Sequence, residues 1–230
     1  KYGMIYFTKQ KLNSKAYLNF AQKFGKPANY PRLRGLNKKY PQITVVQRKS
    51  SDKGPSFGEQ FHTDSSYTKK PPRYTMLLGK LVPPRGQGNT DFASQYLAYK
   101  KLPEKIKVEL ENLRAVFSSS GPISVTRLER EKEKGTGKSK DFQCSHKIIQ
   151  KVNNRKTIYF SPGHVIGIKG VDPKKSRDLL DFLINHQTKA EFVYSFEWEK
   201  NSIAMWDNRA ILHQATAYTG DRIMHRITIQ

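Results

Sequence analysis

The sequence predicts a mainly β domain with flanking α-helices, either a barrel or a double-sheet jelly roll with the helices packed outside. Strand-like segments outnumber helical ones, and the last 40 residues, 191–230, are strand-like almost throughout. The 230 residues can form one large core, and the sequence shows neither an internal repeat nor a sign of a second domain. We therefore expect residues 1–230 to be a single domain.

The first expected elements are one helix and two strands. Residues 12–24 carry an approximate helical stripe of apolar side chains, which Gly25 and Pro27 end. Residues 43–47 and 73–82 are rich in β-branched and apolar side chains, and each predicts a strand.

The middle of the chain predicts a broken helix and a polar insertion. Residues 94–113 are helical in pattern, with Ser94 as the N-cap and Pro103 as a break. Residues 121–143 are highly charged and contain glycines. A long polar segment of this kind predicts a mobile insertion that acts as a lid.

The second half predicts a hairpin, a helix and four further strands. Two strands, 145–152 and 156–162, surround an Asn-Asn-Arg turn. Residues 172–187 predict a helix, because Asp172 is a good N-cap and a proline follows it at the first helical position. The four last strands are expected over 191–199, 202–207, 210–218 and 222–230.

The last strand places two arginines on one face. Side chains at alternate positions of a strand share a face, so Arg222 and Arg226 point the same way and His225 points the other way. A buried unpaired guanidinium is costly, so two inward arginines indicate an anion between the sheets. An exposed edge strand with solvated arginines remains the alternative.

Composition limits the partners. The chain has 42 Lys and Arg against 19 Asp and Glu, a formal net charge of +23. Its lysine pairs are scattered, and no zinc-finger spacing or RNA-binding signature is present, which favours a solvated lysine-rich surface over a specific nucleic-acid module. No apolar run approaches the ~20 residues of a membrane span. With one cysteine and no signal-peptide pattern, we expect a cytoplasmic protein, and homo-oligomers stay open.

Two histidines and an aspartate are candidate metal ligands. His62 and Asp64 are two positions apart, so on a strand they would point to one side, and His213 lies in a later apolar strand. Taken alone, a histidine in such a run is more often a hydrogen-bonded core residue than a ligand. Together the three match the two-histidine, one-carboxylate facial triad of non-haem iron(II) oxygenases.

The flanking sequence resembles the taurine dioxygenase (TauD/TfdA) family of 2-oxoglutarate-dependent dioxygenases. The resembling segments are FAQKFGKP (20–27), FHTDSSYTKKPP (61–72), VPPRGQGNTDFASQYLAYKKLP (82–103), SIAMWDNRAILHQAT (202–216) and RIMHRITI (222–229). The resemblance covers nearly the whole chain and is weakest over 121–145. It implies a double-stranded β-helix, the cupin-like jelly roll.

The resemblance also implies roles for the residues that match. His62, Asp64 and His213 would hold Fe(II), with 2-oxoglutarate and O2 as cosubstrates. Arg222 would pair with the distal carboxylate of 2-oxoglutarate, with the hydroxyl of Thr90 assisting it. Arg226 would hold the anionic group of the substrate, unless it is an internal ion-pair partner. The implied reaction hydroxylates an aliphatic carbon while 2-oxoglutarate is decarboxylated to succinate and CO2. The carboxylate of Asp64 favours hydroxylation, because related halogenases have a small residue there.

Two departures from the family pattern argue against taurine as the substrate. Taurine-using members have a histidine near the Tyr30-Pro31 pair and an asparagine where this chain has Gly58. Arg32 and Arg34 could instead serve a different anion near the cavity mouth. We expect a small or medium-sized sulfonate, carboxylate, sulfate ester or phosphonate.

Two other classes stay open at the level of sequence. One is a non-catalytic jelly roll that binds an anionic polymer or membrane surface through its charge. The other is a jelly-roll metalloenzyme such as a cupin isomerase or a cysteine-type dioxygenase. The arginines of the last strand and Thr90 favour the 2-oxoglutarate enzyme. The remaining histidines, at 146, 164, 186 and 225, are expected outside the metal site.

Overall fold

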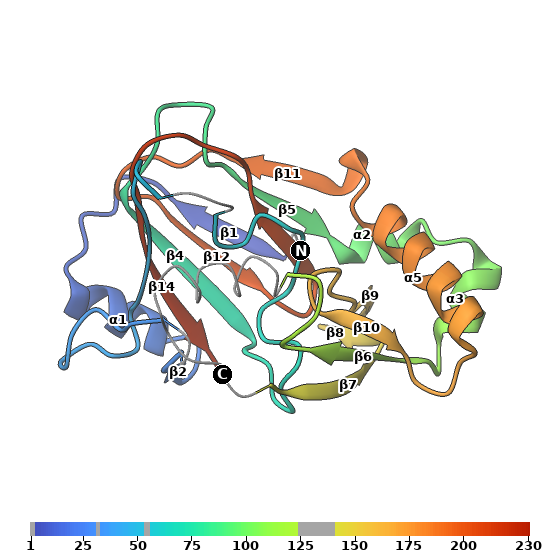
Figure 1. Cartoon of the computed structure of the whole chain (residues 1–230). Coiled ribbons are helices and arrows are strands. Elements are labelled where there is room, and N and C mark those ends of the chain that lie inside the picture. Colours follow the sequence, from blue (N-terminus) through green and yellow to red (C-terminus); the bar gives the residue numbers. More distant parts are fainter. Residues whose placement is uncertain (1–2, 31–32, 53–55, 124–140) are drawn as a thin grey trace.

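The computed structural model describes residues 3–30, 33–52, 56–123 and 141–230. Its largest unit is a six-stranded antiparallel sheet (Figure 1). The strands are hydrogen-bonded in the order β1-β12-β4-β14-β2, and β3 also pairs with β14. Their bounds are β1 Met4–Phe7, β12 Ile203–Asp207, β4 Tyr74–Leu81, β14 Arg222–Ile229, β2 Pro27–Ala28 and β3 Thr44–Arg48.

A three-stranded sheet packs against this one. It has the order β11-β5-β13, with bounds β11 Val193–Phe196, β5 Thr90–Ser94 and β13 Ile211–Ala215. Phe92 of β5, Trp206 of β12 and Met224 of β14 belong to one buried apolar cluster, so side chains of both sheets meet between them. This shared interior is where the functional site lies.

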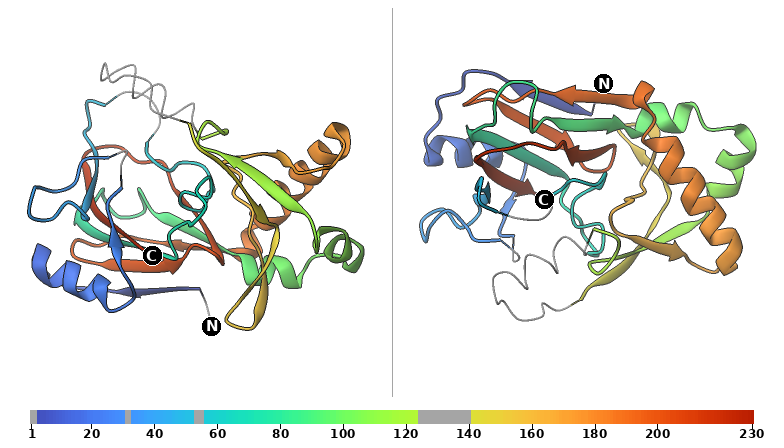
Figure 2. Two further views of the ribbon diagram at one scale, coloured as in Figure 1. Left: turned by 90° about the horizontal axis from the view of Figure 1, so that it is seen from below. Right: turned by 45° about the horizontal axis from the view of Figure 1, so that its top comes forward.

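The remaining strands and helices lie beside these two sheets (Figure 2). The sheet β10-β6-β7 and the hairpin β8-β9 share one large core with helices α2, α3 and α5. The short 3-10 helix Ala190–Phe192 adds Phe192 to that core. The bounds are β6 Arg114–Ser118, β7 Gln143–Lys147, β8 Ile149–Val152, β9 Arg155–Ile158, β10 Val165–Ile168, α2 Gln95–Lys100, α3 Glu104–Leu110 and α5 Pro173–Gln187.

Helix α1 (Ser14–Gln22) is fastened to the large sheet by one tyrosine. The Asn13 side chain caps the helix by accepting from the Ala16 amide. The hydroxyl of Tyr17 lies 3.1 Å from the carbonyl of Met76 and 3.0 Å from the carbonyl of His225. These carbonyls belong to β4 and β14, so α1 is hydrogen-bonded to two neighbouring strands that also line the cavity described below.

Most of the expected elements are confirmed, and the protein is mainly β with few helices. Helix α5 begins after Asp172 with a proline in its first turn, and Ser94 caps α2, as the sequence predicts. Pro103 separates α2 from α3. The four expected C-terminal strands appear as β11 to β14.

One predicted strand is wrong. Residues 145–152 are not a single strand, because β7 pairs with β6 in one sheet and β8 pairs with β9 in another. The chain changes sheets at Ile148, whose amide donates to Leu113 and whose carbonyl accepts from Tyr159. Ile148 and Ile149, on either side of this change, are both buried.

Several strands have no counterpart among the predictions. β1, β2, β5, β6 and β10 are two to five residues long, and none shows the long apolar alternation that marks a strand in sequence. Most of the predicted insertion, 124–140, lies outside the described residues. Within the described ranges, no helix is both long and apolar enough to cross a membrane.

Candidate metal centre

The two histidines of the site are joined through their backbones. His62 and His213 form an isolated antiparallel bridge, with the amide of each donating to the carbonyl of the other at 3.0 and 2.9 Å. Their rings lie 4.2 Å apart, measured between centroids. The predicted strand through His62 and Asp64 is therefore wrong in detail, because only His62 pairs and a turn begins at Asp64. Asp64 nevertheless lies close to both rings.

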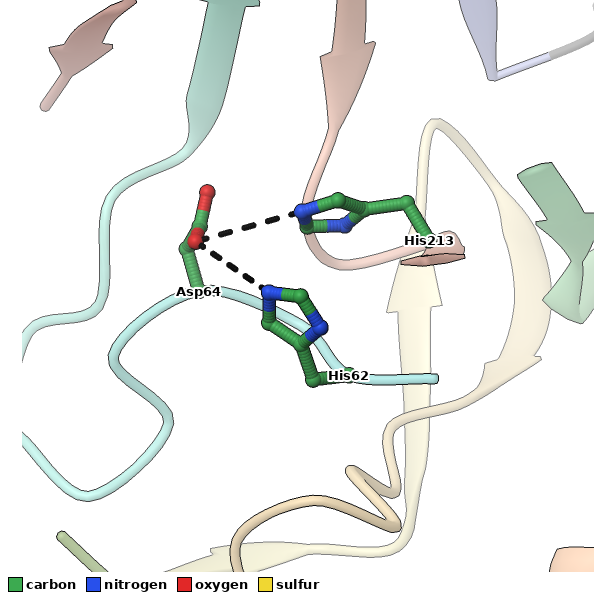
Figure 3. Close-up of side chains that lie close together, drawn as sticks. All are labelled: His62, Asp64 and His213. Atoms are coloured by element: carbon green, nitrogen blue, oxygen red, sulfur yellow. Dashed lines mark ion pairs between the residues drawn. The ribbon is translucent and has the colours of Figure 1, made fainter. Parts of the chain in front are cut away.

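Three ligand atoms converge on one point (Figure 3). Oδ1 of Asp64 lies 3.9 Å from Nε2 of His62 and 4.0 Å from Nε2 of His213. Ligands held about 2.0–2.2 Å from one ion cannot be more than roughly 4.4 Å apart, and both distances satisfy this limit. His62, Asp64 and His213 are all buried, and they form the one such cluster found in the described part of the chain.

The histidines are prepared to act as ligands. Nδ1 of His62 lies 2.7 Å from the carbonyl of Gln60, to which it donates, so its Nε2 lone pair faces the carboxylate. Burial lowers the pKa of His62 and lowers that of His213 further. Both rings are therefore neutral near pH 7, which is the form that binds a metal.

The aspartate is held ionised by an arginine. Nη2 of Arg226 lies 2.8 Å from Oδ2 of Asp64. Burial is the largest single influence and would raise the pKa of the carboxyl, but Arg226, the two histidines and the hydroxyl of Thr75 together outweigh it, so the pKa lies well below its usual range. Two neutral imidazoles and one carboxylate on one side of a cavity suit Fe(II).

All six predicted site residues border one cavity. Thr90, Arg222 and Arg226 line it together with the three ligand residues, and apolar side chains complete the wall. These apolar side chains include Val46, Leu77, Trp206 and Met224. The inward face predicted for the last strand is confirmed, since Arg222 and Arg226 are 4% and 3% exposed.

Arg222 has no acidic partner among the described residues. Its Nε and Nη2 are buried and make no hydrogen bond within that part of the chain, and its guanidinium lies 5.4 Å from the ring centroid of Tyr218. Burial lowers its pKa from the ordinary arginine value, yet an arginine remains charged in proteins. A buried cation that lacks a counter-charge makes this end of the cavity attractive to an anion.

Thr90 is oriented by a tryptophan that the sequence analysis did not single out. The indole Nε1 of Trp198 donates to Oγ1 of Thr90 at 2.9 Å. Since that lone pair is occupied and an indole cannot accept, the hydroxyl hydrogen of Thr90 is free to point into the cavity.

Of the two roles that the sequence left open for Arg226, the structure contains the internal ion pair. The pair is made through Nη2, and the guanidinium also lies 4.8 Å from the ring centroid of Tyr30. Its Nη1 is buried and has no hydrogen-bond partner among the described residues. One nitrogen is therefore taken by Asp64, and another is buried without a hydrogen-bond partner in the described residues.

Three of the other histidines have hydrogen-bond partners of their own. His146 and His186 use Nε2 to meet the carbonyls of Thr68 and Ala98, at 3.0 and 2.8 Å. Nδ1 of His164 lies 3.1 Å from two serine hydroxyls, and its ring is 6.0 Å from that of His62. Of the loop arginines, Arg34 is exposed and Arg32 lies outside the described residues.

Sequence and structure comparisons agree on the kind of protein. A model of the family described as "Taurine catabolism dioxygenase TauD, TfdA family" matches residues 1–228. The alpha-ketoglutarate-dependent 2,4-dichlorophenoxyacetate dioxygenase of Cupriavidus pinatubonensis is 28% identical, over 94% of this chain and 79% of its own. The alpha-ketoglutarate-dependent sulfate ester dioxygenase of Pseudomonas putida is 26% identical, over 100% of this chain and 77% of its own.

A solved structure extends the agreement to the fold. The crystal structure of a taurine dioxygenase from Burkholderia xenovorans superposes with a TM-score of 0.79 at 27% identity. The match covers 99% of this chain and 76% of the other.

Proposed function

Because this chain belongs to the TauD/TfdA family of alpha-ketoglutarate-dependent dioxygenases, we propose that it hydroxylates an aliphatic carbon of a small or medium-sized anionic substrate. The enzyme class itself follows from the family, and alpha-ketoglutarate is 2-oxoglutarate. In the proposed reaction, substrate, O2 and 2-oxoglutarate give hydroxylated substrate, succinate and CO2. We also propose that residues 1–230 are one domain, and that the two sheets around the cavity are the walls of a double-stranded β-helix.

The observation that carries this proposal is the charge on Arg222. Its guanidinium is buried in the same cavity as the ligand cluster, without an acidic partner among the described residues. 2-Oxoglutarate has a carboxylate at each end. With one end at the metal, the other carboxylate would neutralise the charge of Arg222, whose planar guanidinium can bind it through two nitrogens. Thr90, with its hydrogen left free by Trp198, would donate to the same carboxylate.

The ligand residues would leave half of the coordination sphere open. His62, Asp64 and His213 supply three donors from one side, and Fe(II) takes about six. Bound iron would supply the activation of O2. The chain supplies position: Arg222 and Thr90 would fix the cosubstrate. An apolar wall, made of the buried Met224 and the partly buried Val46 and Leu77, limits the access of water.

The anionic class of substrate rests on Arg226. Its Nη1 is free of partners in the described chain, and its charge is only partly used by Asp64. The relatives named above act on a phenoxyacetate, a sulfate ester and taurine, which all carry an anionic group. Gly58 stands where taurine-using members have an asparagine. A Cβ at this position would come within 3.2 Å of Cε1 of His62, so position 58 borders the metal site. The absence of a side chain leaves that corner to the substrate.

Two titrations test the proposal. Fe(II) added under anaerobic conditions, followed by 2-oxoglutarate, should produce a visible charge-transfer band that 2-oxoglutarate alone does not. A panel of sulfonates, sulfate esters, carboxylates and phosphonates, with neutral analogues of equal size, should then be scored by substrate-stimulated succinate release. We expect stimulation by anions only. Stimulation by the neutral analogues alone would refute the anionic class and leave the cosubstrate site intact.

A further inference from the structure

The oxygen of Asp64 that faces away from the histidines is held by two donors. Oδ1 faces both imidazoles, whereas Oδ2 accepts from Nη2 of Arg226 and from the hydroxyl of Thr75. Asp64 and Thr75 are 5% and 0% exposed, so water cannot easily replace either donor. The two oxygens of one carboxylate therefore have separate tasks.

Thr75 is hydrogen-bonded to Asn208, and the orientation of the Asn208 amide follows from two partners, one of which can only donate and the other only accept. The indole nitrogen of Trp206 can only donate, and it lies 3.1 Å from Oδ1 of Asn208. The carbonyl of Pro72 can only accept, and it lies 3.2 Å from Nδ2 of Asn208. These two contacts independently give the Asn208 amide the same orientation, with its nitrogen towards Thr75.

The amide of Asn208 then decides where the hydroxyl hydrogen of Thr75 points. Nδ2 of Asn208 donates to Oγ1 of Thr75 at 2.9 Å. The hydroxyl has one hydrogen of its own, and the ionised carboxylate of Asp64 can only accept it. The contacts form a one-way series from Trp206 through Asn208 and Thr75 to Oδ2 of Asp64.

Asn208 also holds the chain that carries the ligands. Its carbonyl accepts from the hydroxyl of Thr63 at 2.6 Å, and its Oδ1 lies 3.5 Å from the amide of Asp64. A single residue after β12 thus positions both the backbone and the carboxylate of Asp64.

We propose that Asn208 and Thr75 are positioning residues that keep Asp64 a one-oxygen metal ligand. This rests on the proposed function, and it adds a role for two side chains that touch neither metal nor cosubstrate. A carboxylate that is free to rotate can bind an ion through both oxygens, which would occupy a further coordination position. Saturating Oδ2 prevents this and leaves three positions of an octahedral ion for 2-oxoglutarate and O2.

Two substitutions of Thr75 test the role of its hydroxyl. Thr75→Val keeps the branched shape and removes the donor, whereas Thr75→Ser keeps the donor and removes a methyl group. Affinity for Mn(II) and Co(II), measured without 2-oxoglutarate, should fall about 10-fold or more in Thr75→Val and stay within about threefold in Thr75→Ser. On the Fe(II)-loaded protein, Thr75→Val should need several-fold more 2-oxoglutarate to develop the charge-transfer band.

A substitution of Asn208 provides an independent test. In Asn208→Asp the side chain can still accept from Trp206 but cannot donate to Thr75. The hydroxyl of Thr75 should then turn away from Asp64, and metal affinity should fall as it does in Thr75→Val. Asn208→Asp made in the Thr75→Val background should reduce metal affinity much less than it does alone, because Thr75→Val has already removed the hydrogen bond to Asp64.

The controls separate this proposal from its alternatives. A purely structural role would lower the unfolding temperature of the metal-free variants while leaving metal affinity unchanged at temperatures well below it. Equal metal and 2-oxoglutarate affinities in Thr75→Val and the parent protein would refute the proposal. A parent protein that binds no metal, or that gives no charge-transfer band with 2-oxoglutarate, would instead refute the proposed function.

Discussion

At the scale of single residues, the two inward arginines of β14 differ in what surrounds them. Arg226 is paired with Asp64, and this pairing raises its pKa although burial acts in the opposite direction. Arg222 lacks such a partner in the described chain, and burial lowers its pKa. The paired arginine stabilises the metal-free site, while the unpaired one is a cost to folding that a bound anion would remove.

We expect Arg222→Ala to weaken 2-oxoglutarate binding far more than metal binding. Loss of a buried charge-assisted contact to a carboxylate costs about 2–5 kcal/mol, so the dissociation constant of 2-oxoglutarate should rise at least about 30-fold. Affinity for Mn(II) without cosubstrate should change little. The metal-free variant should also unfold at an equal or higher temperature, because an uncompensated buried charge is gone. Unchanged 2-oxoglutarate binding would point to Arg226 as the cosubstrate arginine.

At the scale of elements, the site depends on contacts between strands that are distant in the sequence. The bridge between His62 and His213 ties a loop before β4 to β13. Trp198, which follows β11, reaches Thr90 at the start of β5. His62, His213 and Thr90 are thus each held in place by a segment other than their own.

Trp198→Phe should weaken 2-oxoglutarate binding through Thr90. The ring still fills the buried space, but the donor that fixes the hydroxyl of Thr90 is lost. We expect a loss of several-fold in 2-oxoglutarate affinity, from about 1 kcal/mol for one hydrogen bond, with unchanged metal affinity. Thr90→Val should lose at least as much. The double variant should lose no more than Thr90→Val alone, and full additivity of the two losses would show that Trp198 acts elsewhere.

The opposite face of β14 makes stability depend on pH. Burial, with a smaller effect from Lys80, lowers the pKa of His225 from 6.5 to about 4. Between these values the unfolded chain binds a proton that the folded protein does not, so His225 reduces stability as the pH falls from 6.5 to 4. His225→Gln should therefore gain stability relative to the parent protein over that interval. Denaturant unfolding at pH 7, 5.5 and 4 measures it, and a constant difference between the two proteins would contradict the assignment.

At the scale of the whole molecule, the large positive charge lies apart from the buried arginines. The net charge is +23, and the lysine pairs at 38–39, 69–70, 100–101 and 174–175 are all exposed. They stand on separate loops and helix ends, which agrees with the solvated surface that the sequence favours. Such charges act on an anion mainly as it approaches.

Salt should therefore affect capture of the substrate more than the reaction that follows. Once an anionic substrate is identified, kcat/KM should fall several-fold between about 20 and 300 mM KCl, because the Debye length shrinks to below 10 Å. The value of kcat should change little, since Arg222 and Arg226 are buried from the salt solution. Equal losses in kcat and kcat/KM would show that salt acts on the folded site itself.

The sequence by itself predicted the candidate ligand set, through its resemblance to a known family, and the inward face of β14, through strand alternation. The order of His62, Asp64 and His213, and the alternation of Arg222 and Arg226, depend on local spacing and composition, which a single chain displays. The main helices were predictable for the same reason, because capping residues and apolar stripes act over a few neighbours.

Only the tertiary structure decided how these residues work together. Asp64 meets Arg226 across 162 positions of the chain, and Asn208 meets Thr75 across 133. Such pairs follow from strand order and register, such as β12 beside β4 and β4 beside β14. The sequence could not show that Ile148 divides a predicted strand between two sheets, or that a turn begins at Asp64. Those outcomes depend on which buried surfaces and backbone groups find partners far along the chain, and local pattern carries no information about them.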